Sequence, residues 1–159
     1  MAVVFDCSIT LAWFLQDERT SFTETAFGLL ETTECWVPHL WRLEFPNALL
    51  AAERRRRVGR QQRLEMLESA ARLSLRTDSS LPDLRNLSAL AERRAITVYD
   101  ASYLELAMRN GFDLITLDRD LARAATAEGV PVHAPGRDSA SRVRRRYAKP
   151  AATARAYNI

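Results

Sequence analysis

Short apolar runs that alternate with helical patterns constrain the fold of this chain more than any other feature. The clearest runs are AVVF at 2–5, LITL at 114–117 and VPV at 130–132, and weaker candidates lie at 35–37 and 73–77. Each has the length and composition of a buried strand. Strands that alternate with helices predict an α/β fold with a mainly parallel sheet covered on both faces, in three α/β/α layers.

The segments between these runs carry helical spacing and helix-ending signals. The sequence Ser80-Leu-Pro-Asp83 matches a capping box, which predicts a helix that opens there. Pro46 lies within a second helical segment and cannot donate to the carbonyl of Arg42, so a kink near Glu44 is expected. In all, we expect helices at about 20–31, 39–57, 60–73, 80–94, 97–111 and 118–129.

The length and composition favour one domain that lies in the cytoplasm. A chain of 159 residues with 47% apolar residues can build its own core, and no apolar run approaches the roughly 20 residues that a membrane span requires. The first residues enter a strand without the features of a signal peptide. The only two cysteines, Cys7 and Cys35, are too few for a disulfide framework, so reduced thiols are expected.

Charge divides the chain into a domain at 1–135 and a basic C-terminal tail at 136–159. The tail holds seven basic residues and one acidic residue, a net charge of +6, so the rest of the chain sums to −3. An acidic body with a basic tail favours a nucleic acid or an acidic protein as the partner of the tail. A solvated, flexible terminus explains the same composition.

Two acidic residues come directly after predicted strands. Asp6 follows AVVF and Asp118 follows LITL. The carboxyl ends of parallel strands meet at one rim of a sheet, where ligands of α/β folds bind, so both carboxylates are expected at that rim. An aspartate at such a turn is also a common helix cap, so position alone leaves both roles open.

Two further acids interrupt apolar helix faces. Glu44 shares a face with Leu40, Ala48 and Ala51, and Asp100 shares one with Leu104 and Ala107. Faces of this kind normally pack on the sheet, where a carboxylate needs a cation or a hydrogen-bonding partner. For Asp100 a capping box with Thr97 is an alternative.

Four carboxylates at one rim would repel one another unless a divalent cation neutralised them. Oxygen ligands select hard cations such as Mg²⁺ or Mn²⁺, which suit phosphate substrates. Metal-assisted hydrolysis of a phosphodiester is therefore the predicted reaction. Ser8 and Thr116 flank two of the acids, and each is equally well explained as an orienting group or an ordinary turn residue.

Three segments that contain these acids resemble the acidic segments of PIN-domain ribonucleases, in particular the VapC-type toxins of bacterial toxin-antitoxin pairs. They read VVFDCSITLAWFLQDE, VPHLWRLEFPNALLAA and ITVYDASYLELAMRNGFDLITLDRDL. The resemblance covers nearly all of residues 3–132. It implies that Asp6, Glu44, Asp100 and Asp118 are the catalytic and metal-binding residues, with Asp120 as a possible additional ligand.

The resemblance also implies a five-stranded parallel sheet, Mg²⁺ or Mn²⁺, endonucleolytic cleavage of RNA, a homodimer, and an antitoxin protein that blocks the site, in a complex of both proteins. A toxin of this type would inhibit translation and growth. Two alternatives stay open: the same fold used as a nuclease for RNA maturation or decay, and a non-catalytic RNA-binding module. A receiver domain is disfavoured because its chemistry uses a lysine near the phosphate, and the only lysine is Lys149.

Two further groups of residues each allow more than one interpretation. Arginines cluster at 54–57, 60 and 63, where they can bind an RNA backbone or cover a solvated helix end. Aromatic residues flank the acidic segments and can stack on bases, contact a partner helix or belong to the core: Trp13, Phe14, Trp36, Trp41 and Phe45.

Overall fold

A computed structural model describes residues 2–136, so all but the first residue of the predicted basic tail lies outside the described part. One sheet forms the middle layer, with strands in the order β3-β2-β1-β4-β5, and every neighbouring pair is parallel. The predicted parallel α/β fold is thereby confirmed. The strands are β1 (Ala2–Phe5), β2 (Glu34–Pro38), β3 (Leu75–Asp78), β4 (Asp113–Ile115) and β5 (Val132–His133).

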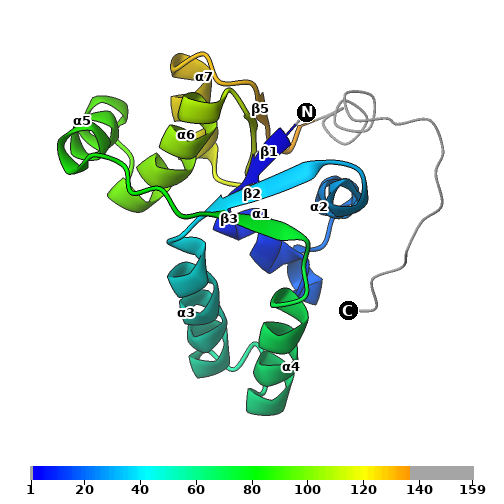
Figure 1. Cartoon of the computed structure of the whole chain (residues 1–159). Coiled ribbons are helices and arrows are strands. Elements are labelled where there is room, and N and C mark those ends of the chain that lie inside the picture. The colour runs from blue at the N-terminus through cyan, green and yellow to red at the C-terminus, as the bar shows by residue number, and fades with distance from the viewer. Residues whose placement is uncertain (1, 137–159) are drawn as a thin grey trace.

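Helices cover both faces of the sheet. Figure 1 shows α5, α6 and α7 gathered on one side and α3 and α4 on the other. The α-helices are α1 (Cys7–Ala12), α2 (Ser21–Gly28), α3 (Trp41–Arg54), α4 (Arg60–Ala70), α5 (Leu84–Arg94), α6 (Val98–Asn110) and α7 (Arg119–Ala127). Two short 3₁₀ turns lie at Gln16–Glu18 and Leu29–Glu31.

The alternation of side chains along β1 explains the two layers. Val3 and Phe5 belong to a core shared with α1 to α4, whereas Val4 belongs to a second core shared with α5, α6 and α7. Successive residues of a strand point to opposite faces, so a strand in the middle of a covered sheet is apolar throughout. This is why AVVF reads as one continuous apolar run.

Aromatic residues supply much of the first core. Trp13, Phe14, Trp41 and Phe45 are buried, so of the three roles open to them they belong to the core, and Trp36 is half-buried. Phe45 packs against Phe14 of the segment after α1, with ring centroids 5.3 Å apart. The indole Nε1 of Trp41 donates to Thr10 Oγ1 at 2.8 Å. These contacts fix α3 against α1, the helix that follows Asp6.

The start of α5 differs from the prediction, and α3 tolerates the proline within it. α5 begins at Leu84, and its cap is Asp83, whose Oδ1 accepts from the backbone N–H groups of Arg85 and Asn86. The predicted capping box with Ser80 is therefore wrong; the Ser80 N–H donates to Asp78 Oδ1 instead. α3 runs unbroken through Pro46, from Trp41 to Arg54.

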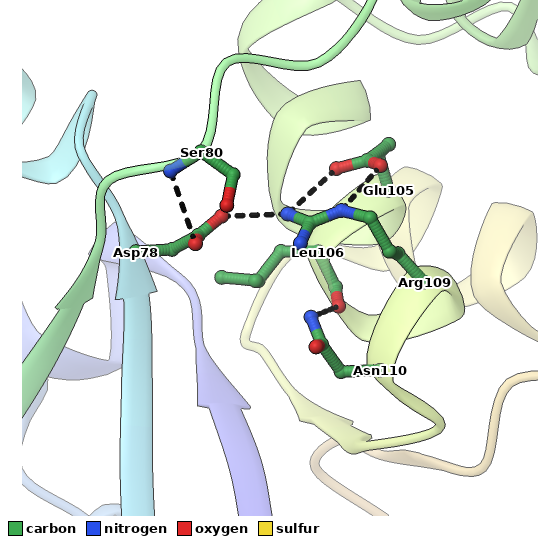
Figure 2. Close-up of polar contacts among 6 residues, drawn as sticks. All are labelled: Asp78, Ser80, Glu105, Leu106, Arg109 and Asn110. Carbon is green, nitrogen blue, oxygen red and sulfur yellow. Dashed lines mark hydrogen bonds and ion pairs between the residues drawn. The ribbon is translucent and has the colours of Figure 1, made fainter.

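An ion pair joins the end of β3 to α6. Figure 2 shows Arg109 between Glu105 on its own helix and Asp78, with nitrogen–oxygen distances of 2.9 and 2.6 Å. Burial opposes ionisation of Asp78, but donors from Arg109 and Ser80 outweigh it and lower the pKa of this carboxyl. The contact fastens the edge strand to the helical layer that carries Asp100.

Both cysteines are free thiols, as predicted, with Cys35 buried and Cys7 partly exposed. Burial raises the pKa of Cys35 to about 12 and that of Cys7 further still, so both stay protonated at neutral pH. None of the helices within residues 2–136 has the length and apolar character needed to cross a membrane.

Candidate active site

The two central strands define where a ligand site is expected. β1 and β4 lie side by side, and the chain leaves β1 into α1 on one face and β4 toward α7 on the other. In parallel sheets such a change of direction opens a crevice beyond the carboxyl ends of the strands. Asp6 directly follows β1 and Thr116 directly follows β4.

Asp6 is held by a network of donors. Its Oδ1 accepts from the Ser8 N–H at 3.0 Å, which caps α1, and its Oδ2 accepts from Ser8 Oγ at 2.6 Å and Thr116 Oγ1 at 2.5 Å. The side chain is 6% exposed. Burial raises the pKa of Asp6, although these hydrogen bonds oppose the shift and Asp100 adds to it. Ser8 and Thr116 thus both donate to the Asp6 carboxylate, as orienting groups would.

Glu44 lies in the first turn of α3, at the margin of its buried face. Its Oε2 accepts from the hydroxyl of Tyr103, a residue of α6, at 2.5 Å. Partial burial raises the pKa of Glu44; the Tyr103 hydroxyl opposes the shift, and the charges of Asp6 and Asp100 add to it. The contact therefore joins helices from opposite faces of the sheet next to Asp6.

Asp100 forms the capping box that the sequence left open. The Thr97 side chain accepts from the Asp100 N–H at 3.0 Å, and Asp100 Oδ2 accepts from the Thr97 hydroxyl at 2.7 Å and its N–H at 3.4 Å. The carboxylate also raises the pKa of Asp6 and Glu44, so it lies within electrostatic reach of both. Capping and membership of the acidic group coexist in this residue.

Asp118 lies at the start of α7. Its Oδ1 accepts from the Leu121 N–H at 2.8 Å and caps α7, and its residue is exposed. Its backbone N–H donates to Thr116 Oγ1 at 2.9 Å, so Thr116 joins Asp118 to Asp6. The Asp120 side chain is 74% exposed and pairs with Arg123 at 3.1 Å.

The structure thus brings Asp6, Glu44 and Asp100 together, connects Asp118 to Asp6 through Thr116, and pairs Asp120 with Arg123. Within the described residues, no three His, Cys, Asp or Glu side chains form a group ready to hold a metal ion. The donor set still suits a hard cation, because it consists of oxygens alone. Glu44, Asp100 and Asp118 each use one carboxylate oxygen in the contacts above and keep the other uncommitted within residues 2–136.

Tyr103 is the functional candidate that the sequence analysis missed. It lies three residues after Asp100, one turn along the same helix, where a tyrosine reads as a core residue. Only the contact with α3, distant in sequence by 59 residues, shows that its hydroxyl reaches Glu44.

The arginine cluster is partly neutralised by its neighbours. Arg57 pairs with Asp17 and Glu18, and Arg63 pairs with Glu53. Arg54, Arg55, Arg56 and Arg60 are exposed and form no ion pair within residues 2–136. A basic surface at the far end of α3 therefore remains.

Comparisons with known proteins agree with this fold. The sequence profile of the PIN domain matches residues 3–127. Ribonuclease VapC3 of Pyrobaculum aerophilum is 32% identical over 133 residues, which cover 82% of this chain and all of that protein. The crystal structure of PAE2754 from P. aerophilum shares the fold, with a TM-score of 0.62 over 83% of both chains at 24% identity. By the extent of both sequence matches, this chain belongs to the PIN-domain family, as a VapC-type member.

Proposed function

We propose that this chain is an Mg²⁺- or Mn²⁺-dependent endoribonuclease that hydrolyses phosphodiester bonds. The convergence of Asp6, Glu44 and Asp100 at the carboxyl ends of β1 and β4 carries the proposal. Burial and mutual repulsion raise the pKa of Asp6 and Glu44, an arrangement that costs stability and that a bound cation would relieve. The name of the relative, ribonuclease VapC3, supports RNA as the substrate.

Asp6, Glu44, Asp100 and Asp118 would hold the cation, with Asp120 as a possible further ligand. A divalent cation bound there would lower the pKa of a water molecule and stabilise charge at a phosphate. Ser8 and Thr116 keep the Asp6 carboxylate in place, and Thr116 also holds the backbone at Asp118. These contacts fix two of the acids before any ligand arrives.

Cleavage of a single-stranded RNA of mixed sequence tests this proposal. The purified chain is expected to cut the RNA internally with Mg²⁺ or Mn²⁺ and to lose this activity in EDTA, and Asp100→Asn should lose it as well. The matched control is Asp83→Asn, because Asp83 also caps a helix but lies outside the acidic group. Cleavage that persists in EDTA would contradict the metal requirement, and folded protein that binds RNA without cutting it would favour the binding-module alternative.

We further propose that the nuclease is the toxin of a toxin-antitoxin pair, which inhibits translation and growth. The VapC-type relationship supports this role. Expression alone should arrest bacterial growth, whereas Asp100→Asn should not. Normal growth in the presence of active nuclease would favour RNA maturation or decay instead. A short gene for an antitoxin directly upstream would support the toxin role.

A homodimer and an antitoxin complex follow from the same relationship as predictions. Leu81, which precedes α5, and Leu84, the first residue of α5, are 89% and 83% exposed, so two large apolar side chains lie in solvent close together in the sequence. We expect a protein partner, either a second copy or the antitoxin, to cover them. Sedimentation of the wild type and of Leu81→Ser/Leu84→Ser, each with and without antitoxin, tests which one does.

A further inference from the structure

The hydrogen bond between Tyr103 and Glu44 is a contact that stability alone explains poorly. Tyr103 is 1% exposed, and its ring lies in the core between α6 and the sheet. A phenylalanine would fill the same space without a polar group to satisfy. The hydroxyl instead reaches out of this core to a carboxylate of the opposite helical layer, at 2.5 Å.

The chemistry of the two groups defines the direction of the bond. A carboxylate only accepts hydrogen bonds, so the Tyr103 hydroxyl is the donor and Glu44 the acceptor. Glu44 accepts through Oε2, which leaves Oε1 without a hydrogen bond within residues 2–136. One oxygen is thus anchored and one is available.

We propose that Tyr103 is a positioning residue for Glu44. The Tyr103 hydroxyl holds one oxygen of the Glu44 carboxylate, so that the other oxygen binds the divalent cation. The inference rests on the proposed metal-dependent function of the site. Tyr103 touches neither the substrate nor the cation in this role; it acts through Glu44. Groups that orient a metal ligand in this way typically contribute about 10- to 100-fold to metal affinity.

Calorimetric titration of the metal-free protein with Mn²⁺ alone tests the proposal. Tyr103→Phe keeps the ring and removes only the hydroxyl, and it should weaken Mn²⁺ binding by about 10-fold or more. Tyr99→Phe is the matched control: the same substitution on the same helix, at a side chain that is exposed and whose hydroxyl has no partner among the described residues. It should leave Mn²⁺ affinity unchanged.

A double-mutant cycle separates positioning from general loosening of the fold. In the Glu44→Gln background, Tyr103→Phe should have little further effect on Mn²⁺ affinity, because the ligand that it orients is gone. A loss of equal size in both backgrounds would overturn the proposal. With RNA, Tyr103→Phe should lower kcat at fixed Mn²⁺ concentration and leave KM nearly unchanged.

An independent measurement uses the wild type and so does not depend on the variant's folding. The Tyr103 hydroxyl proton, shielded and hydrogen-bonded, should give an NMR signal that shifts when Mg²⁺ is added. A signal that stays in place while Mg²⁺ binds would overturn the proposal. Wild-type protein that binds neither Mn²⁺ nor Mg²⁺ would instead contradict the proposed function itself, so the two failures are distinct.

Discussion

Asp6 illustrates the conflict between stability and function at a single residue. It begins α1 as its cap, accepts three hydrogen bonds and is almost fully buried. Its raised pKa shows that burial outweighs this support for the charged form. A carboxylate placed at such a cost is typical of a functional site, where a ligand supplies the missing counter-charge.

The pH dependence of stability should report this cost. The folded pKa of Asp6 is raised above the ordinary value of 3.8. The protonated side chain therefore stabilises the fold fully below pH 3.8, and this stabilisation is lost as the pH rises through the folded pKa. Asp6→Asn cannot ionise. In EDTA, the melting temperature of Asp6→Asn relative to wild type should therefore increase from about pH 4 to about pH 8.

Thermal melts of both proteins across this range measure the difference directly. Asparagine cannot accept every hydrogen bond that the carboxylate accepts, so a constant offset between the two proteins is expected at all pH values. Only the change of this melting-temperature difference with pH reports the pKa of Asp6. A difference that does not change with pH would contradict a raised pKa at Asp6.

Asp118→Asn distinguishes a helix cap from a metal ligand. Asparagine caps helices about as well as aspartate, so the metal-free melting temperature should stay close to that of wild type. A ligand at a hundredfold excess over its Kd stabilises the folded state by about 2.7 kcal/mol. We expect the gain from Mg²⁺ or Mn²⁺ to shrink in this variant and RNA cleavage to fall.

Asp83→Asn serves as its control, because it makes the same change at the cap of α5. It should keep the wild-type response to metal. If Asp118→Asn also kept that response and full cleavage, Asp118 would be a cap alone.

At the scale of elements, three of the four acids take part in capping the N-termini of helices. α1, α6 and α7 each have an acid at the N-cap or in the first turn, whose side chain caps the helix or closes a capping box: Asp6, Asp100 and Asp118. A cap fixes a carboxylate through one oxygen against backbone N–H groups, and the positive end of the helix dipole favours its charged form. The same residues therefore order the helices and supply the acids.

Thr97→Ala tests this double role at α6. Loss of the Thr97 hydroxyl removes the cap and the 2.7 Å hydrogen bond to Asp100, so the free energy of unfolding should fall by about 1 kcal/mol. Thr97→Ser retains the hydroxyl and should restore both stability and metal affinity. Urea denaturation in EDTA measures the first effect and Mn²⁺ titration the second. Equal Mn²⁺ affinity in Thr97→Ala and wild type would show that the cap serves the helix alone.

At the scale of the whole molecule, one exposed basic surface lies where α3 ends and α4 begins. Its arginines form no ion pair within residues 2–136, and the predicted basic tail follows residue 135. The affinity of a protein for RNA rises with the number of phosphates that its arginine and lysine side chains neutralise. We infer that one or both regions hold the RNA while the acids cut it.

Truncation after Pro135 should reduce the salt dependence of RNA or antitoxin binding, if the tail contacts that partner. Each lost phosphate contact lowers the slope of log K against log salt by about 0.9 for a duplex and about 0.7 for a single strand. Arg55→Gln/Arg60→Gln, which removes two arginines between the end of α3 and the start of α4, provides the comparison. If the slope of log K against log salt stayed the same for RNA and for the antitoxin after truncation, the tail would be a solvated terminus that binds neither partner.

The sequence by itself determined the parallel α/β fold and the candidate acids. Continuous apolar runs such as AVVF predict covered strands, and Asp6 and Asp118 follow such runs, because burial on both faces and the end of a strand leave local signals. The Thr97–Asp100 box is equally local. The choice of Asp83 over Ser80 as the cap of α5 leaves no such local signal, since both are good capping residues and packing decides between them.

Only the tertiary structure decided which acids share an environment. It places Glu44 beside Asp6 and Asp100, leaves Asp118 exposed at the start of α7, and gives Glu44 a partner in Tyr103. These relations join helices from opposite faces of the sheet. Periodicity reports which side of a helix is apolar, but the meeting of two helices depends on how the whole sheet and its two cores pack.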